Sequence, residues 1–252
     1  MAATEKFKEM ALSFYGCDGG NLDSSIWICG LEWGGGYENG QINEGEFKAS
    51  PLSSWDSGKE TISTYFTNQY NQKTAWFFSY IFGWNIIDFK LEAEKYCLFS
   101  SSGTGFKMNA FPISFKGRSF INWSEQTQKL TGFDSFEIYR EWCVQKRGAF
   151  FCELIEKHSP KVVICTGITS AMEFIRFFGC NLDTCEYHEH DRFYVAQTNE
   201  EKTLVFVVPF FGHKKTDINS YEKMEALTTQ LHKYASSYFK TQSWYKYSER
   251  ET

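Results

Sequence analysis

Short apolar runs, each followed by a loop and a helix-like segment, restrict how this chain can fold. Residues 161–167 (KVVICTG) and 203–208 (TLVFVV) are apolar, rich in β-branched residues and about as long as one buried strand. The segment after 161–167, ITSAMEFIRFFG, spaces its apolar residues as an amphipathic helix does and ends in glycine. Strands that alternate with helices in this way predict an α/β domain with a largely parallel sheet.

Other segments complete this expected domain. An apolar run that ends in Gly30 predicts another buried strand, and an inner strand is expected to lead into Asn109. Helices are expected near the start of the chain, within the aromatic stretch 74–91, and after Asp217. The expected architecture is a three-layer α/β/α domain with a central, mostly parallel, four-stranded sheet.

The length of the chain fits one domain. Its 252 residues are near the upper limit for a single hydrophobic core. Residues 37–73 are polar and weakly periodic, and 74–91 are densely aromatic. We therefore expect one domain over 1–252, with an aromatic-rich insertion or cap region at about 37–105.

Composition restricts the function classes. The formal net charge is −5, so the whole chain has no general attraction to a polyanion, and any nucleic-acid contact would need local basic loops. The eight cysteines include no C-x-x-C pair, which favours reduced thiols over an iron–sulfur cluster. The first residues lack the apolar run of a signal peptide, so we expect a soluble, cytoplasmic protein with no membrane partner.

Three segments that follow strand-like runs carry chemically useful side chains. In open parallel sheets, ligands bind beyond the carboxyl ends of the strands. GLEWGGG supplies a carboxylate in a glycine-rich loop, KMNAFP a primary amide, and VPFFGHKK an imidazole beside two lysines. Together they predict a site at that edge of the sheet.

The order of these segments resembles the uracil-DNA glycosylase superfamily. The family's first motif follows its first strand as Gly, any residue, a short residue such as Asp or Asn, and then usually Pro; here Gly30, Leu31, Glu32 and Trp33 occupy these positions. The family's base-reading Asn follows an inner strand, as Asn109 does. Trp33 departs from the family's pattern at the usual proline.

The resemblance extends towards the end of the chain. FFCELIEKHSPKVVICTG is similar to the family's helix-to-strand stretch, whereas VPFFGHKK replaces its last motif, a His followed by Pro-Ser. The imidazole of His213 is therefore displaced from the usual place directly after the strand. The resemblance covers roughly residues 23–36 and 106–235.

For catalysis, the resemblance implies roles for Glu32 and His213. Removing a base makes C1′ oxocarbenium-like and leaves negative charge on the departing ring. Glu32 would orient the attacking water and offset the sugar's positive charge, while His213 would donate a hydrogen bond to the departing base. The amide of Asn109 would read the base, uracil in one orientation and cytosine in the flipped one.

Further residues are expected to shape the base pocket. Gly34 stands where uracil-specific members carry a tyrosine that excludes 5-substituted pyrimidines, so a bulkier modified base becomes a candidate substrate. Phe47 or Tyr37 would stack on the flipped base. Lys214, Lys215 and Thr216, ahead of the last helix, would contact the DNA backbone.

The function that the resemblance implies is a monofunctional, monomeric DNA glycosylase in repair or antiphage defence. It would flip out uracil or a modified pyrimidine, such as a glucosylated one, and would hydrolyse the glycosidic bond without a metal or other cofactor. Two alternatives remain open: a non-catalytic module that binds modified DNA or a protein, and a hydrolase of nucleosides or small metabolites. His188, His190 and Asp191 are potential metal ligands, but they alternate along an expected surface hairpin, so no metal is expected.

Overall fold

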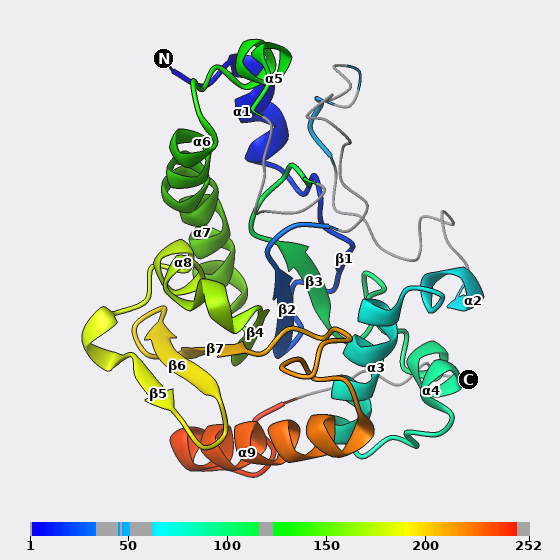
Figure 1. The fold of residues 1–252 in the computed structure, drawn as a ribbon. Helices are drawn as coiled ribbons and strands as arrows, with labels where there is room; N and C mark the ends of the chain where they lie inside the picture. The colour runs from blue at the N-terminus through cyan, green and yellow to red at the C-terminus, as the bar shows by residue number, and fades with distance from the viewer. Residues whose placement is uncertain (1, 34–44, 46, 51–61, 116–122, 246–252) are drawn as a thin grey trace.

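In the computed structural model, residues 2–33, 45, 47–50, 62–115 and 123–245 are described, and they form a sheet with helices on both faces (Figure 1). The strands are β1 (Gly19–Gly20), β2 (Ile26–Gly30), β3 (Phe106–Asn109), β4 (Val162–Thr166), β5 (Glu186–His188), β6 (Phe193–Thr198) and β7 (Thr203–Val208). They join in the order β1-β3-β2-β4-β7-β6-β5.

The sheet is mixed. Its four inner strands β3, β2, β4 and β7 run parallel, whereas β1 is antiparallel to β3, β6 to β7, and β5 to β6. The α/β class is therefore confirmed. The expected number of four strands is wrong, because a short glycine strand extends one edge and a hairpin extends the other in a sheet of seven.

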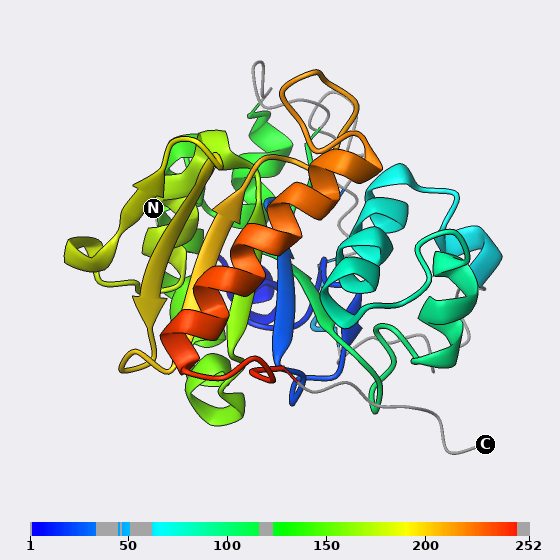
Figure 2. The same ribbon diagram turned by 90° about the horizontal axis from the view of Figure 1, so that it is seen from below.

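The helices lie in two layers, one on each face of the sheet (Figure 2). One layer holds α1 (Glu5–Ala11), α5 (Glu125–Thr131), α6 (Phe136–Trp142), α7 (Gly148–His158) and α8 (Ala171–Phe177). The other holds α2 (Ile62–Tyr65), α3 (Gln69–Phe82), α4 (Phe89–Lys95) and α9 (Tyr221–Phe239). The described part of 37–105 thus supplies α2, α3 and α4 to the layer that contains α9.

Alternating side chains of the inner strands separate the two cores. On β2, Trp27 and Cys29 are buried in the α7 layer, and Ile26 and Ile28 are buried in the α3 layer. Successive side chains of a strand point to opposite faces, so a strand that is apolar throughout must be covered on both sides. This is why the four parallel strands read as continuous apolar runs in the sequence.

Capping residues fix the helix ends. Thr4 caps α1 by accepting a hydrogen bond from the backbone N–H of Phe7 at 3.2 Å. The last helix does not begin after Asp217, as expected, but at Tyr221, with Ser220 as its cap. Asp217 instead accepts a hydrogen bond from the N–H of Lys214 at 2.9 Å, which closes the preceding loop.

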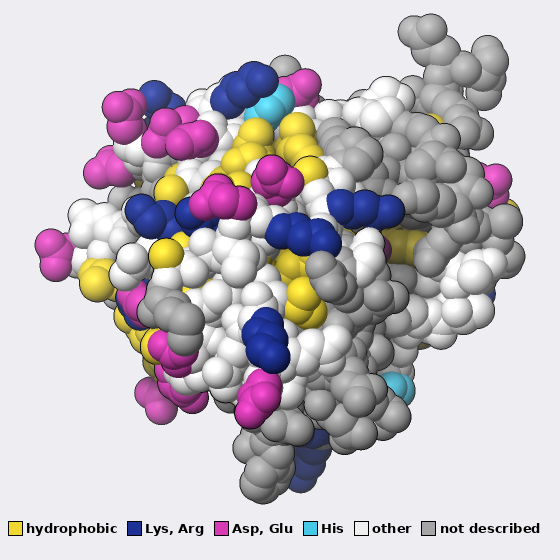
Figure 3. All heavy atoms as spheres, turned by 90° about the horizontal axis from the view of Figure 1, so that it is seen from above, with side chains coloured by type: hydrophobic (Ala, Val, Ile, Leu, Met, Phe, Trp, Pro, Cys, Tyr) yellow, Lys and Arg dark blue, Asp and Glu magenta, His cyan; other side chains and the backbone are white. Residues whose placement is uncertain are grey.

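The surface of the described residues carries mixed charge. Seen from the side of α1 and α5, Lys and Arg side chains alternate with Asp and Glu (Figure 3). No helix within the described ranges is both long and apolar enough to span a membrane.

Candidate functional site

The carboxyl ends of three neighbouring strands bring Gly30, Asn109 and Thr166 together. Gly30 pairs with Asn109 in the register of β2 and β3, and Cys29 pairs with Cys165 in that of β2 and β4, which places Thr166 beside Gly30. Ile28 on β2 and Ile164 on β4, each two residues earlier, are buried in the core beneath α3. Because side chains two apart on a strand point to the same face, Gly30, Asn109 and Thr166 face the layer of α3. The site expected from the sequence at this edge included Gly30 and Asn109, but not Thr166.

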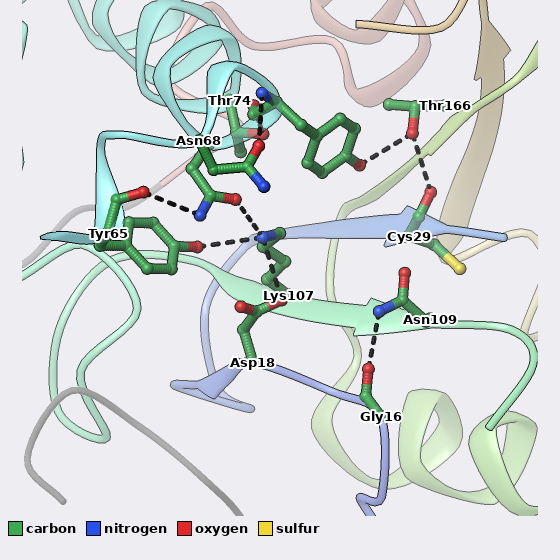
Figure 4. A network of polar contacts seen from close by, with 11 residues as sticks. Gly16, Asp18, Cys29, Tyr65, Asn68, Thr74, Lys107, Asn109 and Thr166 are labelled. Atoms are coloured by element: carbon green, nitrogen blue, oxygen red, sulfur yellow. Dashed lines mark hydrogen bonds and ion pairs between the residues drawn. The ribbon is translucent and has the colours of Figure 1, made fainter. Parts of the chain in front are cut away.

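Gly30 leaves the space that the side chain of Asn109 occupies. A Cβ added to Gly30 would lie only 2.4 Å from Oδ1 of Asn109. The Nδ2 of Asn109 donates to the carbonyl oxygen of Gly16 at 2.6 Å, which directs Oδ1 towards Gly30 (Figure 4). Among the described residues this is the one side-chain hydrogen bond of Asn109, so its amide retains an N–H and a carbonyl oxygen for a ligand.

Tyr70 and Thr166 add two hydroxyls on the other side of Gly30. Tyr70 lies in the first turn of α3, and its hydroxyl is 2.8 Å from Oγ1 of Thr166, which donates to the carbonyl of Cys29 at 3.5 Å. Burial raises the pKa of Tyr70 far above its usual value, so this hydroxyl stays protonated. The ring of Tyr70 stacks on Phe210, with centroids 5.5 Å apart. Sequence reasoning missed Tyr70, because only the tertiary fold brings α3 over β2.

Lys107 is a buried cation on the same face of β3 as Asn109 (Figure 4). Its Nζ forms an ion pair with Asp18 at 2.9 Å and donates to Oδ1 of Asn71 at 2.6 Å and to the hydroxyl of Tyr65 at 3.1 Å. These partners use all three of its N–H donors. The sequence did contain a sign of this buried cation, because Lys107 stands two residues before Asn109 in an otherwise apolar strand. The sequence-based prediction of the site did not include it.

Arg147 is a second buried cation near Asn109. It follows α6 in a π-helical segment, Cys143–Arg147, and has no exposed surface. Its guanidinium donates to backbone carbonyls of Ala11, Ser13, Tyr15, Asn109 and Ala110. Arg147 therefore holds the chain before Gly16 against the end of β3. No local sequence pattern distinguishes this arginine from a surface one.

Glu32 lies next to the segment that follows β3. Its Oε1 accepts a hydrogen bond from the N–H of Phe115 at 3.5 Å, and Trp33 donates from Nε1 to the carbonyl of Pro112 at 3.2 Å. Glu32 also contributes, after burial and Cys143, to raising the pKa of Tyr139. The structure thus places the Glu32 carboxylate beside the segment that follows β3 and near Tyr139 of α6, in the helix layer opposite α3.

His213 lies in the loop after β7 and is exposed. The loop is attached to α3, because Lys73 donates from its buried Nζ to the carbonyl of Gly212. The expected role of His213 as a hydrogen-bond donor to the departing base stays a prediction.

The three residues expected to hold DNA phosphates are exposed in the same loop: Lys214, Lys215 and Thr216. The last helix begins beyond this loop, at Tyr221, and its cap, Ser220, accepts from the N–H of Lys223. The expected contact of the three residues with the DNA backbone stays a prediction.

Phe47 does not line this site. Its side chain is 2% exposed and packs in the core with its ring centroid 6.1 Å from that of Phe7, so its faces are covered. The expectation that it stacks on a base is corrected by this burial. Gly34 and Tyr37 lie outside the described residues.

Within the described ranges, no group of three His, Cys, Asp or Glu side chains is placed to hold a metal ion, and His188 instead stacks on Phe193. All eight cysteines are free thiols. Comparisons with protein-family models, curated proteins and solved structures gave no match. Fold and site together define an α/β protein with a polar cluster at the ends of its parallel strands.

Proposed function

We propose that this chain is a DNA glycosylase that hydrolyses the N-glycosidic bond of uracil or a modified pyrimidine. The observation that carries the proposal is the amide of Asn109, held by Gly16 beside the side-chain-free Gly30. A primary amide with one free N–H and one free carbonyl oxygen matches the donor and acceptor edge of a pyrimidine.

The arrangement of the strands supports the same proposal. The four inner strands are parallel, and the segments that resemble the glycosylase superfamily end at neighbouring positions of this unit, Gly30 on β2 and Asn109 on β3. Ligand sites of open α/β sheets lie at such strand ends. Glu32 lies two residues beyond Gly30, and its carboxylate accepts from the N–H of Phe115 in the segment after β3.

In the proposed reaction, a water oxygen bonds to C1′ of the sugar while the bond from C1′ to the base nitrogen breaks. Glu32 would orient the water, accept its proton and offset the positive charge that develops on the sugar. The base leaves with the electron pair of the broken bond and is protonated afterwards. Asn109 would stabilise the leaving base through hydrogen bonds that strengthen as its negative charge grows.

The test is release of free base from DNA that contains uracil, hydroxymethylcytosine or glucosylated hydroxymethylcytosine. We expect the wild type to release one of these bases, and both Glu32→Gln and Asn109→Ala to lower kcat/KM by about a hundredfold or more. Glu153→Gln is the matched control, because Glu153 is an exposed carboxylate on α7. Failure of the wild type to release base from any DNA in the panel would overturn the proposal.

A second candidate, a hydrolase of free nucleosides or small metabolites, is favoured by charge. The net charge is −5, and acidic side chains alternate with basic ones on the face that Figure 3 shows. DNA binding draws much of its free energy from contacts to phosphates, which a small neutral substrate does not need. Free nucleosides in the same assay separate the candidates, because their hydrolysis without base release from DNA selects the second.

A third candidate, a non-catalytic module that binds modified DNA or a protein, is favoured by the loop after β7. His213 is exposed there, and the motif VPFFGHKK departs from the family's His-Pro-Ser. Retardation of one modified DNA in a gel, without release of base or hydrolysis of nucleosides, would select this candidate.

A further inference from the structure

Two oxygen atoms converge on the space beside Gly30. Besides Oδ1 of Asn109, the hydroxyl oxygen of Tyr70 lies 3.7 Å from the point where a Cβ of Gly30 would stand. Gly30 thus keeps an amide oxygen and a phenol oxygen close to one spot that its own side chain would otherwise fill. No local sequence pattern predicts that these two oxygens lie close together, because Tyr70 is in α3, 40 residues after Gly30 in the chain.

The hydrogen bonds around Thr166 leave the phenol oxygen of Tyr70 able to accept. Oγ1 of Thr166 donates to the carbonyl of Cys29 at 3.5 Å, and in its contact with Tyr70 either hydroxyl can be the donor. In both directions the oxygen of Tyr70 keeps at least one lone pair for a ligand. Because burial raises its pKa, the phenol stays neutral and the lone pairs are those of a hydroxyl, not a phenolate.

The position of Tyr70 is held by several contacts. The side chain of Asn68 caps α3 by accepting from the N–H of Tyr70 at 2.8 Å, and Phe210 stacks on its ring. The next residue of α3, Asn71, accepts from Lys107, which connects this helix turn to the strand of Asn109. A preorganised acceptor of this kind discriminates well, because a ligand without a donor would leave it unpaired.

From this geometry we infer that Tyr70, supported by Thr166, is a specificity-determining residue that accepts a hydrogen bond from an N–H of the bound pyrimidine. The inference rests on the proposed function and adds a substrate class to it: pyrimidines whose N–H at this edge is unsubstituted, such as the ring N–H of uracil or the amino group of a cytosine. Methylation of that nitrogen removes the donor and adds bulk beside Gly30.

The test measures binding of free bases as well as their release. Free uracil, free cytosine and their N-methylated forms are titrated calorimetrically into the wild type and into Tyr70→Phe, which removes only the hydroxyl. We expect the wild type to bind an unmethylated base about tenfold more tightly than the methylated one, and Tyr70→Phe to lose most of this preference. The same loss is expected in kcat/KM for the DNA that carries the base.

Two further variants separate recognition from stability. Tyr65→Phe is the matched control, because Tyr65 is also a buried tyrosine, but its hydroxyl accepts from Lys107. It should keep the preference of the wild type even if it unfolds more easily. Thr166→Val should weaken the preference, and Thr166→Ser, which keeps the hydroxyl, should restore it.

The outcomes distinguish this inference from the proposed function. Base release by a wild type whose preference is unchanged in Tyr70→Phe would overturn the role of Tyr70 and leave the glycosylase proposal standing. Binding of free bases with the expected preference, without any base release, would support Tyr70 and contradict the glycosylase. A wild type that neither binds nor releases any base contradicts both.

Discussion

Gly30 and Asn109 are register partners on adjacent parallel strands, and the absence of a side chain on Gly30 allows the amide of Asn109 to lie across it. The contact is backbone against side chain, and a Cβ at Gly30 would overlap Oδ1 at 2.4 Å. Real Cβ atoms do not approach an oxygen this closely. The position of Asn109 therefore depends on a glycine of the neighbouring strand.

Gly30→Ala should displace the Asn109 side chain. Because both residues are buried, the clash should lower the free energy of unfolding by about 1 to 3 kcal/mol and, under the proposed function, abolish base binding. Denaturant unfolding and base titration measure the two effects. In the double variant Gly30→Ala/Asn109→Ala the clash is absent, so part of the lost stability should return. Additive losses in the double variant would contradict the contact.

Lys107→Met should destabilise the protein more than the loss of a surface ion pair. Its removal leaves Asp18, Asn71 and Tyr65 without their shared buried donor, which should lower the free energy of unfolding by about 2 kcal/mol or more. The control is Lys202→Met, because Lys202 pairs with Glu200 at 2.7 Å with its side chain 58% exposed. That change should cost about 0.5 kcal/mol or less. If Lys107→Met and Lys202→Met lowered the free energy of unfolding equally, the buried hydrogen bonds of Lys107 would stabilise the protein no more than a surface ion pair does.

Stability should fall at alkaline pH. Burial raises the pKa of Cys143 from 9.0 to about 12, and that of Tyr139 well above its usual value. As pH rises, the unfolded chain therefore releases these protons before the folded protein does. The stability that the buried, protonated groups contribute is complete below their ordinary pKa values, and it is lost as pH rises towards their pKa values in the folded protein. Cys143 alone should lower the free energy of unfolding by about 2 kcal/mol at about pH 10.5.

Urea unfolding at neutral and alkaline pH measures this effect. Cys143→Ala removes one titrating group, so its stability should fall less steeply with pH than that of the wild type. Val144→Ala is the control, because it truncates a neighbouring buried side chain that does not titrate. Its loss of stability should be the same at both pH values. If Cys143→Ala and the wild type fell equally steeply, the thiol would not be the cause.

Much of the fold followed from local sequence patterns. Apolar runs bounded by turn formers located β2, β4 and β7, and periodic apolar residues located α1, α8 and α9. These elements are long or strongly patterned. A face that is buried must carry apolar side chains, so the sequence of each element shows which of its faces are covered. The edge strand β1 was missed, because its residues, Gly19 and Gly20, have no side chains to form a pattern.

The start of α9 shows where local patterns mislead. Asp217 and Ser220 are both good capping residues, and only the loop geometry decides between them. Asp217 is used inside the loop, where it accepts from Lys214, so Ser220 caps the helix. The helix therefore starts further from Lys214, Lys215 and Thr216 than the sequence predicted.

The sequence by itself determined the α/β class, the parallel inner strands and the presence of Glu32 and Asn109 at strand ends, because each of these depends on residues close together in the chain. Only the tertiary structure decided what surrounds them. Tyr70, Lys107 and Arg147 reach the polar cluster from a helix, a strand interior and a π-helical segment, through contacts between residues far apart in sequence. Whether a tyrosine or a buried cation lies beside these strand ends depends on how the helix layers pack on the sheet, and no periodic pattern within one segment records that packing.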